Sequence, residues 1–167
     1  MSAKDPAQAD GGADQHALGA ALRRAWVGYR VRLDAEMAAA GFADSGLPDG
    51  RILHICAARG GVTISDVGRE LGITRQGASK AVARLHERGY VELHPSPGDR
   101  REKVAGLTGR AEAFLAAQRR ANRKIARALR TEVGDDAIDA LYRLLDALGT
   151  EDVPRLRDYL RTAGTQE

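Results

Sequence analysis

Residues 62–108 read VTISDVGRELGITRQGASKAVARLHERGYVELHPSPGDRREKVAGLT, and this stretch decides the fold. Thr63 and Asp66 have the spacing of a helix-capping box, with Asp in place of the usual Glu or Gln. The helix that they open has an apolar stripe and ends at Gly72, and Thr74 is the N-cap candidate of a second helix. The stretch therefore predicts two helices joined by a tight turn.

The second helix is expected from Arg75 to about Arg88, before Gly89, and its two sides differ in chemistry. At 100° per residue, one side gathers Ala78, Ala81, Val82 and Leu85, and the opposite side gathers Gln76, Ser79, Lys80, Ala83 and Glu87. We expect the apolar side to pack and the polar side to face outward.

Two short strands are expected after Gly89. Residues 90–94 (YVELH) alternate and favour a strand, residues 95–98 (PSPG) favour a turn, and residues 102–107 (EKVAGL) can return as a second strand. Ala105 and Gly106 are poor strand formers, and Gly106 suggests a bulge. The pattern predicts a β-hairpin with a weak second strand.

Helices are expected on both sides of this stretch. A long helix from about His16 to Ala40 is predicted by the stripe Leu18, Leu22, Trp26, Tyr29, Leu33 and Met37. A shorter helix is expected from Pro48 or Asp49 to Arg59, before Gly60 and Gly61. Beyond residue 108, apolar spacing predicts helices over about 114–133, 138–148 and 153–160. The fold class is mostly α with a small β-hairpin.

The positive charge is concentrated in the middle of the chain. Residues 69–130 carry 15 Lys and Arg against 6 Asp and Glu, a net charge of +9, whereas residues 1–68 carry −1 and residues 131–167 carry −5. Clustered cations gain free energy from releasing the counterions of a polyanion. Charge alone leaves a solvated basic face open as an alternative.

Three runs carry a family resemblance: Leu71-Gly72-Ile73-Thr74, Leu85-His86-Glu87-Arg88-Gly89-Tyr90-Val91, and Asp99-Arg100-Arg101 eight residues before Leu107-Thr108. Residues 62–108 resemble the MarR family of bacterial regulators at matching spacing, and Ala111 departs from it where glycine is common. The resemblance implies a winged helix-turn-helix DNA-binding lobe with N- and C-terminal dimerisation helices.

The resemblance implies a sequence-specific transcriptional repressor. Such a protein would bind a pseudo-palindromic operator in double-stranded DNA as a homodimer, and a small-molecule effector would release it from the operator. The expected DNA-contacting residues are Thr74, Arg75, Gln76, Ser79, Lys80, Arg84, Asp99, Arg100 and Arg101. Gln76 and Lys80 suit base edges in the major groove, and Thr74 suits phosphates at the positive end of its helix. By resemblance, Asp99 orients Arg101 into the minor groove.

Other chemistry has weaker support in the sequence. Trp26 and His54 are candidate effector contacts, although Trp26 also fits core or dimer packing. Cys56 is expected to be a buried small hydrophobe, and redox sensing through Cys56 and non-specific architectural DNA binding remain alternatives. We expect no enzyme activity, no cofactor and no metal site, because the four histidines lack ligand spacing.

The expected organisation is a single domain between two tails. Residues 1–15 and 163–167 are the tails, residues 16–47 and 109–162 the dimerisation helices, and residues 48–108 the winged helix-turn-helix lobe. Residues 1–14 lack the apolar region of a signal peptide, and the chain has no run of eighteen apolar residues. We expect no membrane association and a cytoplasmic location.

Overall fold

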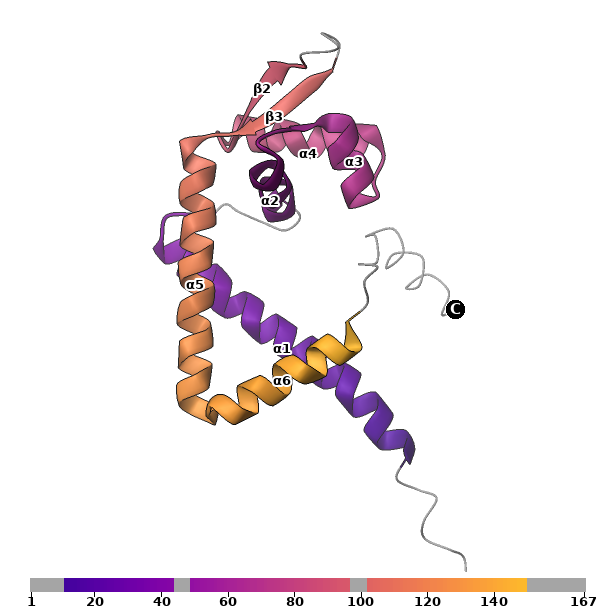
Figure 1. Cartoon of the computed structure of the whole chain (residues 1–167), viewed down its shortest axis with the longest axis vertical. Helices are drawn as coiled ribbons and strands as arrows, with labels where there is room; N and C mark the ends of the chain where they lie inside the picture. Colours follow the sequence, from indigo (N-terminus) through magenta and orange to yellow (C-terminus); the bar gives the residue numbers. More distant parts are fainter. Residues whose placement is uncertain (1–10, 44–48, 97–101, 150–167) are drawn as a thin grey trace, which may run out of the picture. The chain divides into compact units, whose positions relative to one another are not determined.

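A computed structural model describes residues 11–43, 49–96 and 102–149 (Figure 1). The chain divides into two units, residues 1–43 and 44–167. The first holds α1 (Gly11–Ala39). The second holds, in order, α2 (Asp49–Arg59), β1 (Val62–Thr63), α3 (Ile64–Leu71), α4 (Arg75–Glu87), β2 (Val91–Pro95), β3 (Lys103–Leu107), α5 (Gly109–Val133) and α6 (Asp135–Leu148).

Helix α1 begins earlier than its apolar stripe predicts. It starts at Gly11 and not near His16, so part of the expected tail is helical. A helix gains one hydrogen bond for each residue added, and no proline stands between Gly11 and His16 to stop it. Of the predicted stripe, Leu33 and Met37 are buried, whereas Trp26 is exposed.

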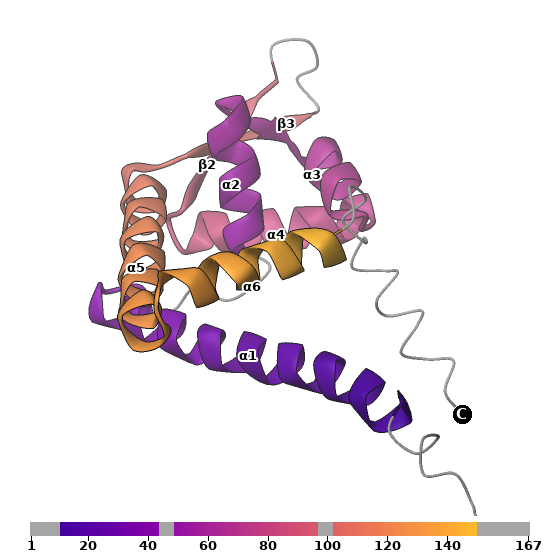
Figure 2. The ribbon, with the colours of Figure 1, turned by 60° about the horizontal axis from the view of Figure 1, so that its bottom comes forward.

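Helix α2 has the predicted bounds and contributes to the core of the second unit. Ile52, Leu53 and Cys56 are buried, as expected for Cys56. The helix contacts both α4 and β3 (Figure 2). Gly60 and Gly61 follow it with φ of 68° and 136°, which turns the chain into β1.

The helix-turn-helix forms where the capping residues predict it. The Thr63 hydroxyl oxygen accepts a hydrogen bond from the Asp66 amide at 3.1 Å, and the hydroxyl donates to the Asp66 carboxylate at 2.9 Å. Gly72 ends α3 in the left-handed conformation, with φ 64°. Thr74 caps α4 by accepting from the Gly77 amide at 3.1 Å. Both predicted caps are therefore confirmed.

Helices α3 and α4 meet at Gly68, which is buried within α3. A Cβ atom at Gly68 would lie 3.2 Å from the Ile73 carbonyl oxygen and 3.6 Å from the Ala78 Cβ. The Gly68 carbonyl also accepts the Ile73 amide at 2.9 Å, so the turn closes directly onto this residue. The absence of a side chain here sets how closely α4 packs on α3.

The predicted hairpin is the larger part of a three-stranded sheet. Strands β2 and β3 pair antiparallel, and β1 pairs antiparallel with the other edge of β3, giving the order β1-β3-β2. We did not predict β1, because two residues are too few to show the alternation of a strand. Its pairing of Val62 with Ala105 makes β3 the central strand.

The predicted bulge at Gly106 is wrong. The register runs without interruption from Val91 opposite Leu107 through Glu92 opposite Gly106 to Leu93 opposite Ala105. Ala105 is fully buried at the centre of the sheet. The small residues that weaken the strand as a sequence signal therefore fit a crowded central position.

Thr108 joins the sheet to α4 and α5. Its amide donates to the Tyr90 carbonyl at 3.1 Å, and its hydroxyl donates to the Gly89 carbonyl at 2.7 Å. The Thr108 hydroxyl oxygen also accepts a hydrogen bond from the Ala111 amide at 3.3 Å and so caps α5. The buried Tyr90 ring meets Phe114 of α5 edge-on, with 5.7 Å between ring centroids. The hydrogen bonds of Thr108 thus fix the direction in which α5 leaves the lobe.

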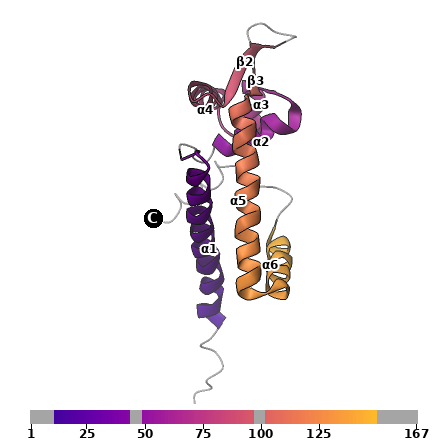
Figure 3. The same ribbon diagram turned by 90° about the vertical axis from the view of Figure 1, so that its left-hand side faces the viewer.

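Helices α5 and α6 are the two long predicted helices, and Figure 3 shows α5 running from the strands to α6. Helix α5 ends at Gly134, which has a φ of 87° and separates it from α6. Across the break, Arg130 pairs with Asp135 at 2.7 Å and with Asp139 at 2.9 Å. The helix predicted over 153–160 lies outside the described residues.

We predict that Gly68→Ala lowers the free energy of unfolding by about 1–3 kcal/mol, because the new methyl group needs α3 and α4 to move apart. Gly109→Ala is the matched control, since a Cβ atom at Gly109 meets nothing within 4 Å. The control should leave stability unchanged or raise it by up to about 1 kcal/mol. Urea unfolding of both variants measures the difference, and equal stabilities would show that Gly68 does not limit the approach.

Candidate nucleic-acid interface

Helix α4 presents the polar face that its sequence predicts. Ala78, Ala81, Val82 and Leu85 are buried. Gln76, Ser79, Lys80, Ala83, Arg84 and Glu87 are all exposed. The burial of one side against the core leaves amide, hydroxyl and ammonium groups on the N-terminal half of the other, where they are free to meet base edges.

The N-terminal end of α4 favours anions. Thr74 and Arg75 are exposed here, and α4 has no acidic residue in its first turn, whereas α3 and α5 carry Asp66 and Glu112 there. The Thr74 oxygen accepts the capping hydrogen bond. The Arg75 charge adds to the partial positive charge of the helix end, so this end is electropositive.

A hollow of about 320 Å³ lies between α4 and the strands. Its lining is Ile64, Arg75, Ser79, Val82, Ala83, Leu93 and Lys103. The exposed Lys103 of β3 therefore shares this surface with Arg75 and Ser79 of α4. Our sequence reasoning missed Lys103, although its place in the basic run after Asp99 was a usable signal.

The structure brings most of the expected DNA contacts onto one helix. Thr74, Arg75, Gln76, Ser79, Lys80 and Arg84 lie on α4 or at its cap. Asp99, Arg100 and Arg101 lie outside the described residues, in the connection between β2 and β3. The hairpin that carries them is present next to α4, as the contact between α4 and β2 shows.

A protein-family model matches the part of the chain that holds α4 and its neighbours. Residues 46–102 match the model of the MarR family. The matched range holds α2, the helix-turn-helix and β2. The winged-helix segment is therefore similar to the MarR family. No curated protein matches the sequence.

Solved structures extend the likeness beyond the MarR family segment. RV1404 from Mycobacterium tuberculosis has a TM-score of 0.70 at 20% identity, over 89% of this chain and 95% of that one. A mutant MarR from Escherichia coli, complexed with operator DNA, has a TM-score of 0.64 at 17% identity, over 85% and 100%. YusO from Bacillus subtilis has a TM-score of 0.67 at 11% identity, over 83% of this chain and 96% of that one. These likenesses show that the fold is that of winged-helix MarR structures.

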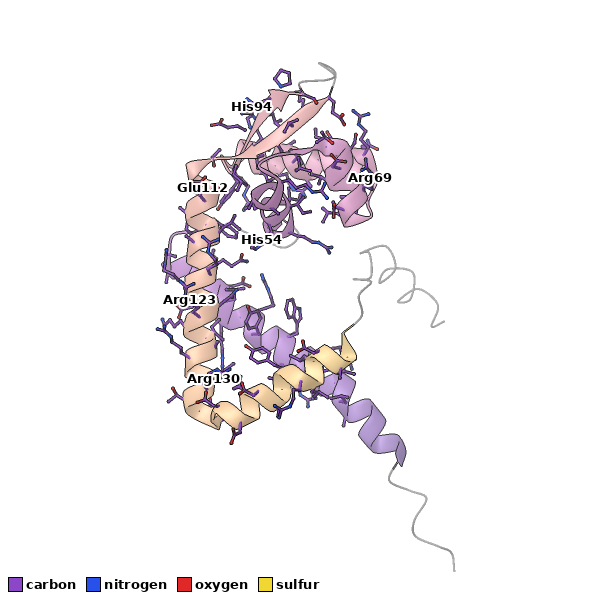
Figure 4. The ribbon with its side chains drawn as sticks, in the orientation of Figure 1. His54, Arg69, His94, Glu112, Arg123 and Arg130 are labelled. Atoms are coloured by element: carbon purple, nitrogen blue, oxygen red, sulfur yellow. The ribbon has the colours of Figure 1, made fainter. Side chains whose placement is uncertain are left out.

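The two candidate effector contacts lie in different units of the chain. Trp26, in α1, is 56% exposed and stacks on Tyr29 with 5.8 Å between ring centroids. His54, in α2, is exposed, and its Nε2 lies 2.7 Å from Oε1 of Gln118 in α5 (Figure 4). A joint role of Trp26 and His54 stays a prediction.

No group of three or more His, Cys, Asp or Glu residues that could hold a metal ion is found within residues 11–43, 49–96 and 102–149.

In the described part of the chain, none of the helices combines the length and the apolar character that crossing a membrane requires.

Cys56 sits in an environment that suppresses thiol chemistry. Its side chain is 1% exposed. Burial raises the pKa of the Cys56 thiol to about 11, because the thiolate loses the solvation that stabilises it in water. A thiol with this pKa is almost entirely protonated near neutral pH and is a poor nucleophile.

We predict that iodoacetamide alkylates Cys56 slowly in the native protein at pH 7.5. A pKa of about 11 leaves about 3 thiolates in 10,000 at that pH, and the side chain is shielded. The same protein in denaturing urea is the control and should react promptly. Mass spectrometry measures both rates. Prompt alkylation of the folded protein would contradict the burial of Cys56 and favour a redox role.

Proposed function

We propose that this protein is a homodimeric MarR family transcriptional repressor that binds a pseudo-palindromic operator in double-stranded DNA. The observation that carries the proposal is the exposed polar face of α4 beside the β2–β3 hairpin, capped by Thr74 at an electropositive end. A helix of this kind fits the major groove, and a hairpin beside it reaches the adjacent backbone.

The proposed contacts divide into reading and positioning. Gln76 can make a bidentate pair with adenine, and Lys80 can donate to guanine. Arg75, Arg84 and Lys103 are placed to neutralise phosphates, which fixes register without reading sequence. By resemblance, Asp99 orients Arg101 into the minor groove, and Arg100 adds a further cation.

The homodimer is supported by an apolar face of α6 that is exposed in the described part of the chain. Leu141, Tyr142, Leu144, Leu145 and Leu148 of α6 are between 40% and 50% exposed. Large exposed apolar faces mark interaction sites, and a two-fold axis buries the same face on both copies. Two related copies also place two α4 helices toward successive major grooves, which a pseudo-palindrome requires.

We further propose that a small-molecule effector releases the dimer from DNA and that the protein acts in the cytoplasm. Trp26 and His54 stay the proposed effector contacts. The His54–Gln118 hydrogen bond supports this role for His54, because it joins α2 of the lobe to α5. A ligand that competes for this bond would act on the connection through which α5 holds the lobe.

We predict that Gln76→Ala costs about 1–3 kcal/mol at one base position and relaxes the preference there, because the lost amide is the base-reading group. Duplexes selected by the protein from a random library provide the target. Glu87→Ala, at the C-terminal end of the same exposed face, is the control and should change affinity little.

Fluorescence anisotropy with the selected site and its single-base variants measures both proteins. An unchanged base preference in Gln76→Ala would remove α4 from the reading surface. Equal affinity of the wild type for selected and random duplexes would instead favour an architectural, non-specific DNA-binding protein.

We predict that the double variant Leu141→Glu/Leu145→Glu is a folded monomer, because four buried charges per dimer cannot be solvated in an apolar interface. Arg143→Glu places a charge reversal on the other side of α6 and should leave the dimer intact. Light scattering after size exclusion gives the mass, and circular dichroism checks the helix content. A dimeric double variant would show that this face of α6 is not the interface.

A further inference from the structure

The outward side of α4 has an apolar residue near its centre. In α4, which the structure describes in full, Ala83 is the only apolar residue that is exposed. At 100° per residue, Ala83 falls about 20° from the direction of Gln76 and about 60° from that of Lys80. Gln76 and Lys80 are the proposed base-reading residues. Ala83 therefore faces the same base edges, although it has no group that can form a hydrogen bond with them.

Ala83 lies where the outward side of α4 is shallow. Ser79 precedes it by four residues, so the two short side chains are neighbours on the helix surface. Both line the hollow of about 320 Å³ that α4 shares with the strands. A base edge can come closer to the helix backbone over two short side chains than over a lysine or an arginine. Ala83 is thus placed for close contact with a base.

Phosphate binding accounts for the cations of this hollow but not for its apolar lining. Arg75 and Lys103 are placed to neutralise phosphates. Ile64 and Leu93 are half-buried and line the same hollow, next to Ala83. Phosphate oxygens would lose water against these carbon atoms and gain no hydrogen bond from them. An apolar group of a base suits this part of the surface better.

The major groove of DNA offers one such group, the C5-methyl of thymine, and an alanine methyl can contact it. We propose that Ala83 is a specificity-determining residue that recognises a thymine methyl group in each half-site. The inference rests on the proposed function, in which α4 enters the major groove. Ala83 follows Gln76 by seven residues, or about 10 Å along α4. With base pairs about 3.4 Å apart, its thymine lies about three base pairs from the base that Gln76 reads.

Deoxyuridine scanning of the duplex selected from a random library tests this inference on the wild-type protein. Each thymine in one half-site is replaced in turn by deoxyuridine, which lacks the methyl group and keeps every hydrogen-bonding group of the base. Fluorescence anisotropy gives the affinity of each duplex. We expect one position at which the affinity falls about fourfold, the effect of one methyl group that stays in water. It should lie about three base pairs from the position at which Gln76→Ala relaxes the preference.

The variant Ala83→Gly removes the contacting methyl group from the protein. It should bind the thymine and the deoxyuridine duplex of that position with equal affinity. Each protein is compared with itself on two duplexes, so a general loss of stability or affinity cancels. Ala57→Gly removes an exposed alanine methyl from α2 and is the matched control. The control and Gln76→Ala should both keep the fourfold difference.

The outcomes separate this inference from the proposed function. A selected sequence whose thymines can all be replaced without loss of affinity would overturn the role of Ala83 and leave α4 as the reading helix. A difference between thymine and deoxyuridine that persists in Ala83→Gly would assign the methyl contact to another residue and also overturn it. A library from which no sequence is enriched would overturn the proposed function, and the inference with it.

Discussion

The close approach of α3 and α4 at Gly68 is the contact on which the presentation of α4 depends. The Ile73 carbonyl oxygen lies 3.2 Å from the place that a Cβ atom of Gly68 would take, and the Gly68 carbonyl accepts the Ile73 amide. Because the turn closes on the helix that precedes it, α4 has a fixed direction, and burial of Val82 and Leu85 fixes its rotation. The polar side of α4 is then the only side left for a ligand. Thr108 extends the same rigidity to the sheet and to α5 through the carbonyls of Gly89 and Tyr90.

Local signals made the helices and most of the site predictable. These signals are the caps at Thr63 and Thr74, the stop at Gly72 and the helical spacing of the apolar residues in α4. Each depends on residues within a few positions of one another, so it can be read without tertiary context. Strand β1 and the regular register at Gly106 depend on pairing between distant segments, and local propensity does not contain this information. Lys103 stands in the basic run after Asp99, which was a local signal, but its position beside Arg75 follows only from the pairing of β3.

The distribution of charge was visible in the sequence, but its division into separate surfaces was not. The basic middle of the chain holds cations of two kinds: those of α4 and β3, which share one hollow, and those of α5, which line another. The net charge of the segment sums the cations of both surfaces and so does not separate them. The helical period of α5 and its direction away from the lobe separate them, so one basic segment gives two surfaces. Figure 3 shows the direction of α5.

Hydroxyl-radical footprinting on a duplex selected from a random library tests the central claim most directly. The account predicts an enriched inverted repeat, with two protected segments on one face of the duplex and centres about one helical turn, or about 10 base pairs, apart for each dimer. Continuous protection, or a library from which the protein enriches no sequence, would contradict the claim that α4 reads DNA as half of a two-fold pair.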